Sequence, residues 1–176
     1  MIHATLRPLV LAVPLALLAC CAATAEDRLG LERVLVQGPD LHPALETVSL
    51  PDGSSRLLPA EVQPTNPHLS TDLAFVDTVA RYGSQGNLDG MGMGAALFGL
   101  YHDGAALGIY GLEALSAGDA SYREALLRDI WAHNVRGDRA RVHRGGEVLL
   151  VVFHDGVPAE TWEAVNEELA ERLVRP

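Results

Sequence analysis

Apolar residues near the end of the chain follow two different spacings. Residues 147–153 are apolar almost throughout, which is typical of a central strand covered on both faces. Over residues 158–174 the large apolar residues recur every three or four positions. This spacing predicts a helix with one buried stripe, made of Trp162, Val165, Leu169 and Leu173.

The same helical spacing occurs over residues 70–82. We expect Ser70 to cap this helix and Gly83 to follow its end. A glycine-rich loop over residues 83–94 then leads to the next apolar segment. The positions predicted to pack in the core are Leu73, Phe75, Val76, Val79 and Ala80.

A further helix is predicted over residues 120–136. Ser121 and Glu124 have the spacing of a capping box, and Gly137 would end the helix. His133 lies on its apolar face, where a buried and hydrogen-bonded histidine is the common outcome. We expect Trp131 and Trp162 to pack beneath a sheet.

Two β-hairpins account for the remaining apolar segments. The first pairs residues 95–101 with 105–114, and the second pairs 140–144 with 147–153. Asp-Gly lies between the strands of the first hairpin, and Gly-Gly lies between those of the second. Both dipeptides favour the tight turns of hairpins because they tolerate positive φ.

The order of these elements predicts an α+β domain over residues 70–176. Two ββα units would form one antiparallel sheet with the helices packed on one face, preceded by the extra helix of residues 70–82. Residues 26–69 contain six prolines and predict an irregular or β-hairpin segment, with a strand at 31–36 and a turn at 50–54. We expect edge strands and loops there rather than core.

This order, α-ββ-α-ββ-α, resembles a known arrangement. The helix ending in His133-Asn134, the hairpin after it and the Gly156-Val157 entry to the last helix are similar to type III secretion chaperone-like domains and the bacterial YbjN-type family. The resemblance covers residues 70–174 and implies a fold alone, because no site residues come with it.

The N-terminus is typical of a signal peptide. Arg7 precedes an apolar run of 11 residues, and Ala23-Thr24-Ala25 has the small residues that a signal peptidase prefers. The run is shorter than the ~20 residues of a membrane span. We therefore expect residues 1–25 to be removed and the mature chain to be periplasmic or secreted.

An alternative interpretation of this segment is a lipoprotein signal. Leu17-Leu18-Ala19-Cys20 is similar to a bacterial lipobox, in which Cys20 would carry the lipid and anchor an outer-membrane lipoprotein. Both cysteines, Cys20 and Cys21, precede residue 26. Cleavage after Ala25 would leave a mature domain without disulfide or thiolate chemistry.

Charge and composition exclude several classes of function. The chain of 176 residues has 13 basic residues, all of them arginine, and 23 acidic residues, for a net charge of −10. Without lysine there is no P-loop lysine or Schiff base. The acidic balance argues against nucleic-acid binding, and no later segment is long and apolar enough to span a bilayer.

Met91, Met93 and His102 suggest a metal site. The methionines are two positions apart in the glycine-rich loop, and His102 follows at the first hairpin turn. Thioethers suit Cu(I), and imidazole suits copper in either oxidation state, so copper is the expected cofactor of this alternative. Packing of the methionines as flexible gap-fillers is the other interpretation.

Catalytic motifs are absent from the sequence. There is no Gly-x-Ser-x-Gly elbow, and Ser84 is a loop serine without a recognisable triad partner. The spacing of His102, His133, His143 and His154 does not place two ligands on one helical face. We therefore expect a non-enzymatic cell-envelope domain that binds a protein partner or forms a homodimer, with residues 83–104 as its working surface. Periplasmic copper binding is the alternative, and a small hydrolase is the second alternative.

Overall fold

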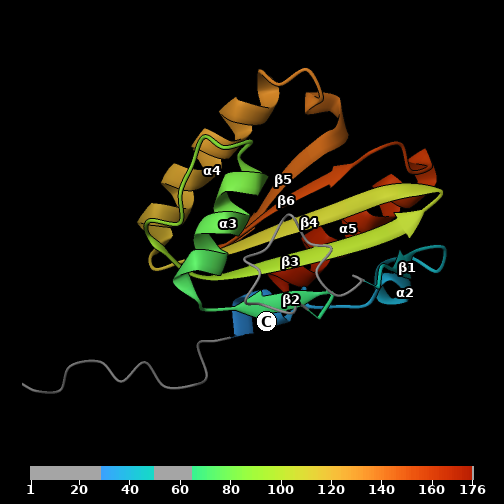
Figure 1. The fold of residues 1–176 in the computed structure, drawn as a ribbon, viewed down its shortest axis with the longest axis horizontal. Coiled ribbons are helices and arrows are strands. Elements are labelled where there is room, and N and C mark those ends of the chain that lie inside the picture. The colour runs from blue at the N-terminus through green and yellow to red at the C-terminus, as the bar shows by residue number, and fades with distance from the viewer. Residues whose placement is uncertain (1–28, 50–64, 176) are drawn as a thin grey trace, which may run out of the picture.

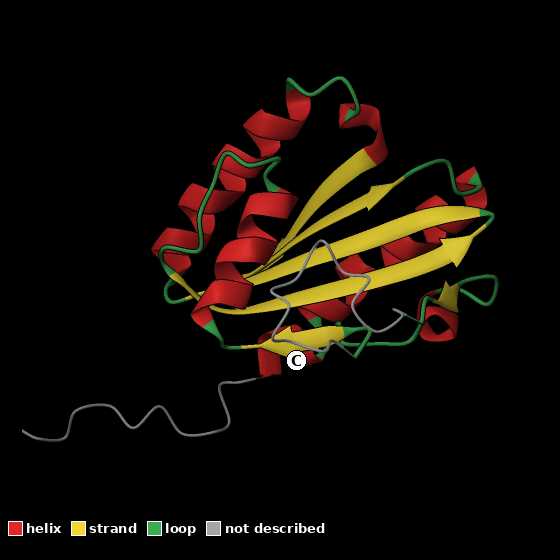
Figure 2. Cartoon of the chain, viewed as in Figure 1, coloured by secondary structure: helices red, strands yellow, loops and turns green. Residues whose placement is uncertain are grey.

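One antiparallel sheet organises the part of the chain that the computed structural model describes, residues 29–49 and 65–175. The strand order is β1-β3-β4-β6-β5, and β2 also pairs with β3. The strands are β1 (Glu46–Thr47), β2 (His68–Ser70), β3 (Met93–Asp103), β4 (Ala105–Ala114), β5 (Ala140–Gly145) and β6 (Val148–His154). The predicted α+β class is confirmed (Figure 2). The predicted signal peptide, Cys20 and the turn at 50–54 lie outside the described residues.

Both predicted hairpins are present. The chain reverses between β3 and β4 at Gly104, whose φ of 67° suits glycine. Between β5 and β6 the turn is Gly146-Glu147, one residue later than predicted, because Gly145 still pairs with Val148. Gly146 takes the positive φ of 61° that this two-residue turn requires.

The helices lie on both faces of the sheet, so the expectation of one covered face is wrong (Figure 1). Helices α3 (Leu73–Gly83) and α4 (Ala117–Ala132) cover one face, while α1 (Leu29–Glu32), α2 (Gly38–Leu41) and α5 (Ala159–Val174) cover the other. Strand β6 explains this arrangement, because it is apolar on both sides. Val148, Leu150 and Val152 join the α5 core, whereas Leu149 and Val151 join the α3–α4 core.

The segment before α3 contributes to the core, contrary to expectation. The predicted strand at 31–36 is instead the end of α1 followed by a turn. Leu31, Val34, Leu41 and Leu45 are all buried in the cluster that includes α5. Their spacing of three, seven and four positions suits short helical turns rather than the alternation of a strand.

Two helices begin at other residues than predicted. Asp72 caps α3, because its carboxylate accepts the N–H of Phe75 at 3.0 Å. Leu73 then falls outside the buried stripe and is 75% exposed, whereas the other predicted core positions of α3 are buried. Ser116, rather than Ser121, caps α4 and accepts the N–H of Asp119.

Helix α4 also ends earlier than predicted, at Ala132. His133 is therefore exposed and pairs with Asp129 instead of packing in the core. Both tryptophans are buried as predicted, at 5% exposure for Trp131 and 6% for Trp162. Among the described residues, none of the helices combines the length and hydrophobicity needed to cross a membrane.

Candidate functional site

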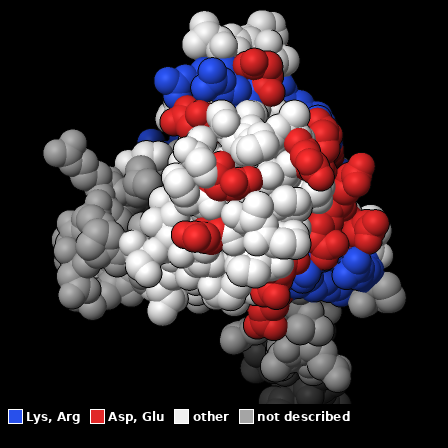
Figure 3. All heavy atoms as spheres, turned by 90° about the vertical axis from the view of Figure 1, so that its right-hand side faces the viewer, with Lys and Arg blue, Asp and Glu red and all other residues white. Residues whose placement is uncertain are grey.

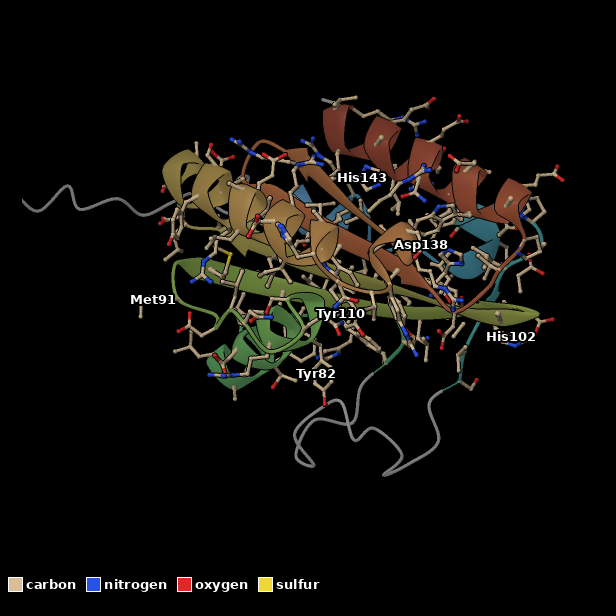
Figure 4. The ribbon with its side chains drawn as sticks, turned by 90° about the horizontal axis from the view of Figure 1, so that it is seen from above. Tyr82, Met91, His102, Tyr110, Asp138 and His143 are labelled. Atoms are coloured by element: carbon tan, nitrogen blue, oxygen red, sulfur yellow. The ribbon has the colours of Figure 1, made fainter. Side chains whose placement is uncertain are left out.

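The three residues of the predicted copper site lie far apart. Met91 is 75% exposed in the loop before β3, and Met93 is buried in the α3–α4 core. His102 lies at the other end of the same strand (Figure 4). At ~3.3 Å per residue, Met93 and His102 are separated by roughly 30 Å, so one ion cannot bind both. Within the described ranges, no cluster of three His, Cys, Asp or Glu side chains is arranged to hold a metal.

The glycine-rich loop, predicted to be the working surface, is tied to the helices beside it. The Arg123 guanidinium donates to the Asp89 carboxylate at 3.0 Å and to the Met91 carbonyl at 2.6 Å. The N–H of Gly90 donates to Asp77 of α3 at 3.1 Å. Ser84 is fully buried and accepts the N–H of Leu88, which makes it a structural residue.

The histidines have separate partners. The His143 ring nitrogen Nε2 lies 2.7 Å from the side-chain oxygen of Asn166. His154 lies against Trp162 with a ring-centroid distance of 4.4 Å. Burial lowers the pKa of both imidazoles. The four candidate histidines thus do not converge on one catalytic centre.

An open groove of about 590 Å³ runs beside strand β5, and sequence reasoning missed it. Four consecutive β5 residues, 140–143, contribute to its lining. Successive side chains of a strand point to opposite faces of a sheet. Four consecutive residues can therefore line one groove only where it opens on the backbone edge of the strand.

This edge of β5 is unpaired among the described residues. Strand β5 ends the sheet order and pairs with β6 alone. The two-residue turn makes Gly145 and Val148 a hydrogen-bonded pair, and such pairs alternate along an antiparallel ladder. The backbone groups of Ala140, Val142 and Arg144 therefore point away from β6. The N–H of Ala140 donates to the Gly137 carbonyl, which leaves the N–H groups of Val142 and Arg144 for another strand.

Helices α4 and α5 flank this edge (Figure 4). The α4 side of the groove combines the apolar side chains of Trp131, Ala132 and Val135 with the guanidinium of Arg128. Trp131 is fixed there by a hydrogen bond from its indole N–H to the Gly83 carbonyl at 2.9 Å, and the side chain of Val135 is 98% exposed. On the α5 side, Arg141 forms a bidentate pair with Glu163, with N–O distances of 2.6 and 2.7 Å. The Arg141 guanidinium also lies 5.4 Å from the Trp162 ring centroid.

Arginines gather around the same edge. In Figure 3 a band of arginine lies near the top of the molecule, where α4 ends and β5 begins. The arginines there pair with three carboxylates: Arg128 and Arg144 share Glu124, Arg136 and Arg139 share Asp155, and Arg141 pairs with Glu163. Among the residues that line the groove itself, Arg128 and Arg141 outnumber the carboxylate of Asp138, in a chain of net charge −10.

The comparisons with known proteins give no further guide to this groove. The chain matches no family model, and searches of curated proteins and of solved structures gave no match. What the groove does must therefore be inferred from its own residues.

Proposed function

We propose that the protein is an exported, non-enzymatic binding domain that takes up an extended segment of a partner protein as an additional strand beside β5. The observation that carries the proposal is the groove whose floor is the unpaired edge of β5. In strand addition, main-chain hydrogen bonds supply affinity and the neighbouring side chains supply specificity. The free N–H groups of Val142 and Arg144 fit the first role, and the lining of α4 fits the second.

The arginines favour a different protein over a second copy of this chain as the occupant. Pairing β5 with its own copy would bring two arginine-rich edges together. Like charges on neighbouring strands destabilise the pairing. A partner segment without this positive charge avoids the repulsion.

The test compares two substitutions of one residue. Val142→Pro removes the outward N–H, whereas Val142→Ala removes the side chain beyond Cβ and keeps the N–H. The probes are short synthetic peptides of alternating valine and polar residues, with binding followed by fluorescence anisotropy. We expect the wild-type protein and Val142→Ala to bind, and Val142→Pro to lose at least about tenfold in affinity, the effect of ~1.4 kcal/mol. Circular dichroism checks that both variants are folded.

Two results would overturn the proposal: equal binding by the proline variant, or no binding of any peptide by the wild-type protein. Sedimentation of the wild-type protein tests whether two copies of the chain associate. A dimer that Val142→Pro dissociates would make self-association the function of this edge.

Export and metal content are tested on protein recovered from a bacterial envelope fraction supplied with copper. Native mass spectrometry should find a chain beginning at Glu26 and no bound metal. A mass that includes an acylated Cys20 would place the protein at a membrane surface. A stoichiometric copper adduct lost on Met91→Leu and Met93→Leu would restore the copper alternative.

A further inference from the structure

We infer that the segment bound beside β5 carries acidic side chains at alternate positions, recognised by Arg128 on the α4 side of the groove. This inference rests on the strand addition proposed above, and names the chemistry of the partner.

The first argument is the sharing of one carboxylate by two guanidinium groups. Arg128 contacts Glu124 at 2.9 Å, and Arg144 contacts the same carboxylate at 3.3 Å. Arg144 is also held by Ser121 at 2.8 Å and by the Gly146 carbonyl at 2.9 Å. The Arg128 side chain, in contrast, is 56% exposed and lines the groove. A second carboxylate can therefore approach Arg128 from the groove.

The second argument is the difference between the two sides of the edge. On the α5 side, Glu163 already occupies the Arg141 guanidinium through two hydrogen bonds. The same face of α5 adds the exposed carboxylates of Glu160 and Glu167. A strand added to β5 would thus meet the exposed Arg128 guanidinium toward α4, and toward α5 a guanidinium that is already paired, beside exposed carboxylates.

The third argument is the geometry of a strand. Successive side chains of the bound segment would point alternately toward α4 and toward α5. The favoured partner has acidic residues at every second position, facing Arg128, and neutral or basic residues between them. Exposed ion pairs are worth ~0.2–1 kcal/mol, so each matched contact changes affinity by about 1.5- to 5-fold.

The experiment uses three peptides that share alternating valines and carry glutamate, threonine or lysine between them. For the wild-type protein we expect the glutamate peptide to bind about 3- to 10-fold more tightly than the lysine peptide, with threonine between them. High salt should reduce this difference, because exposed charges are screened. Arg128→Gln should remove the preference, and Arg128→Glu should reverse it.

Arg81→Glu is the matched control. Arg81 is 55% exposed, which matches Arg128, and it forms an i,i+4 pair with Asp77 on α3, which matches the spacing of Arg128 and Glu124. The control should keep the wild-type order of peptides. A reversed order in Arg81→Glu would show that overall charge acts rather than Arg128, and would overturn the inference.

The remaining outcomes separate the two proposals. Equal binding of all three peptides to the wild-type protein would overturn the acidic partner and leave strand addition standing. Binding of none of them would overturn both, because the edge would then accept no strand.

Discussion

The two edges of the sheet differ in what covers them. On the β3 side, β1 pairs with residues 101–102 and β2 pairs with residues 96–98, so short segments cover the strand. On the β5 side no described segment pairs with the outer edge, although a groove runs along it. Unpaired edges invite association, and proteins commonly cover or charge them. This chain covers one edge with backbone and surrounds the other with arginine.

If β5 binds a partner strand as proposed, charged side chains can both protect an edge and make it selective. Charged side chains deter pairing between identical edges. The same positive charge attracts a segment of opposite charge. At β5 the arginines would therefore exclude a second copy and admit an acidic strand. Four substitutions test how far the two edges differ.

Asn66→Ala should have the largest effect on stability, because the Asn66 side chain joins β3 to the segment that follows β1. Its amide nitrogen donates to the carbonyls of Val48 and Leu100 at 2.7 and 2.6 Å, and its oxygen accepts the N–H of Leu100 at 2.9 Å. Losing three hydrogen bonds should lower the free energy of unfolding by about 3 kcal/mol in chemical denaturation. Asn134→Ala, at the groove, is the control and should cost less than about 1 kcal/mol. Equal losses would contradict the contrast between the edges.

Gly145→Ala should show that the open edge is nevertheless held firmly by α5. An added Cβ would lie 2.7 Å from the Leu173 Cβ and even closer to the Leu173 carbonyl oxygen. Such overpacking should reduce the free energy of unfolding by about 2 kcal/mol. Gly146→Ala has no neighbour within 4 Å and a φ of 61°, so only backbone strain of about 1 kcal/mol should result. If Gly145→Ala lowers the free energy of unfolding less than Gly146→Ala does, α5 can shift to accommodate the added methyl group.

His143→Gln should weaken the pH dependence of stability on the α5 side of β5. Burial lowers the pKa of His143 in the folded protein below its unfolded value of about 6.5. The unfolded chain therefore binds a proton first on acidification, and the wild-type protein should lose stability as the pH falls below ~6.5. Chemical unfolding at several pH values should show a shallower loss for His143→Gln, with His102→Gln as the exposed control. If the loss of stability with falling pH is as steep in His143→Gln as in the wild-type protein, it must come from His68 and His154, whose pKa values burial also lowers.

Arg141→Ala should have the smallest effect on stability. The side chains of Arg141 and Glu163 are 41% and 54% exposed, and exposed ion pairs contribute under about 1 kcal/mol. The free energy of unfolding should therefore fall by less than about 1 kcal/mol. A loss above ~2 kcal/mol would show that the arginines at this edge are structural.

Patterns of a few neighbouring residues predicted those parts of the fold that depend on residues close together in the chain. Asp-Gly and Gly-Gly indicated both hairpins, and the continuous apolar run of residues 147–153 indicated the central strand β6. Strand β2 is three residues long and depends on pairing with β3, so no periodicity could reveal it. The side of the sheet that each helix covers is likewise decided by contacts distant in sequence.

The groove beside β5 could not be predicted from the sequence for a similar reason. It forms where the end of α4 meets the start of β5, and neither segment carries a recognisable motif. A signal was nevertheless present: residues 136–144 hold four arginines against one aspartate. The net charge of −10 conceals this local excess, because it averages over the whole chain. Charge summed over short windows would have drawn attention to β5.

The packing of the first helices on the last one has a consequence for biosynthesis. Arg33 donates to the carbonyl of Arg175, and Arg172 donates to the carbonyl of Arg33 at 3.4 Å. The chain is synthesised from its N-terminus, so the contacts of α2 with α5 can form only after α5 has been made. Until then α2 lacks this neighbour, although its Leu41 side chain is buried in the same apolar cluster in the complete fold.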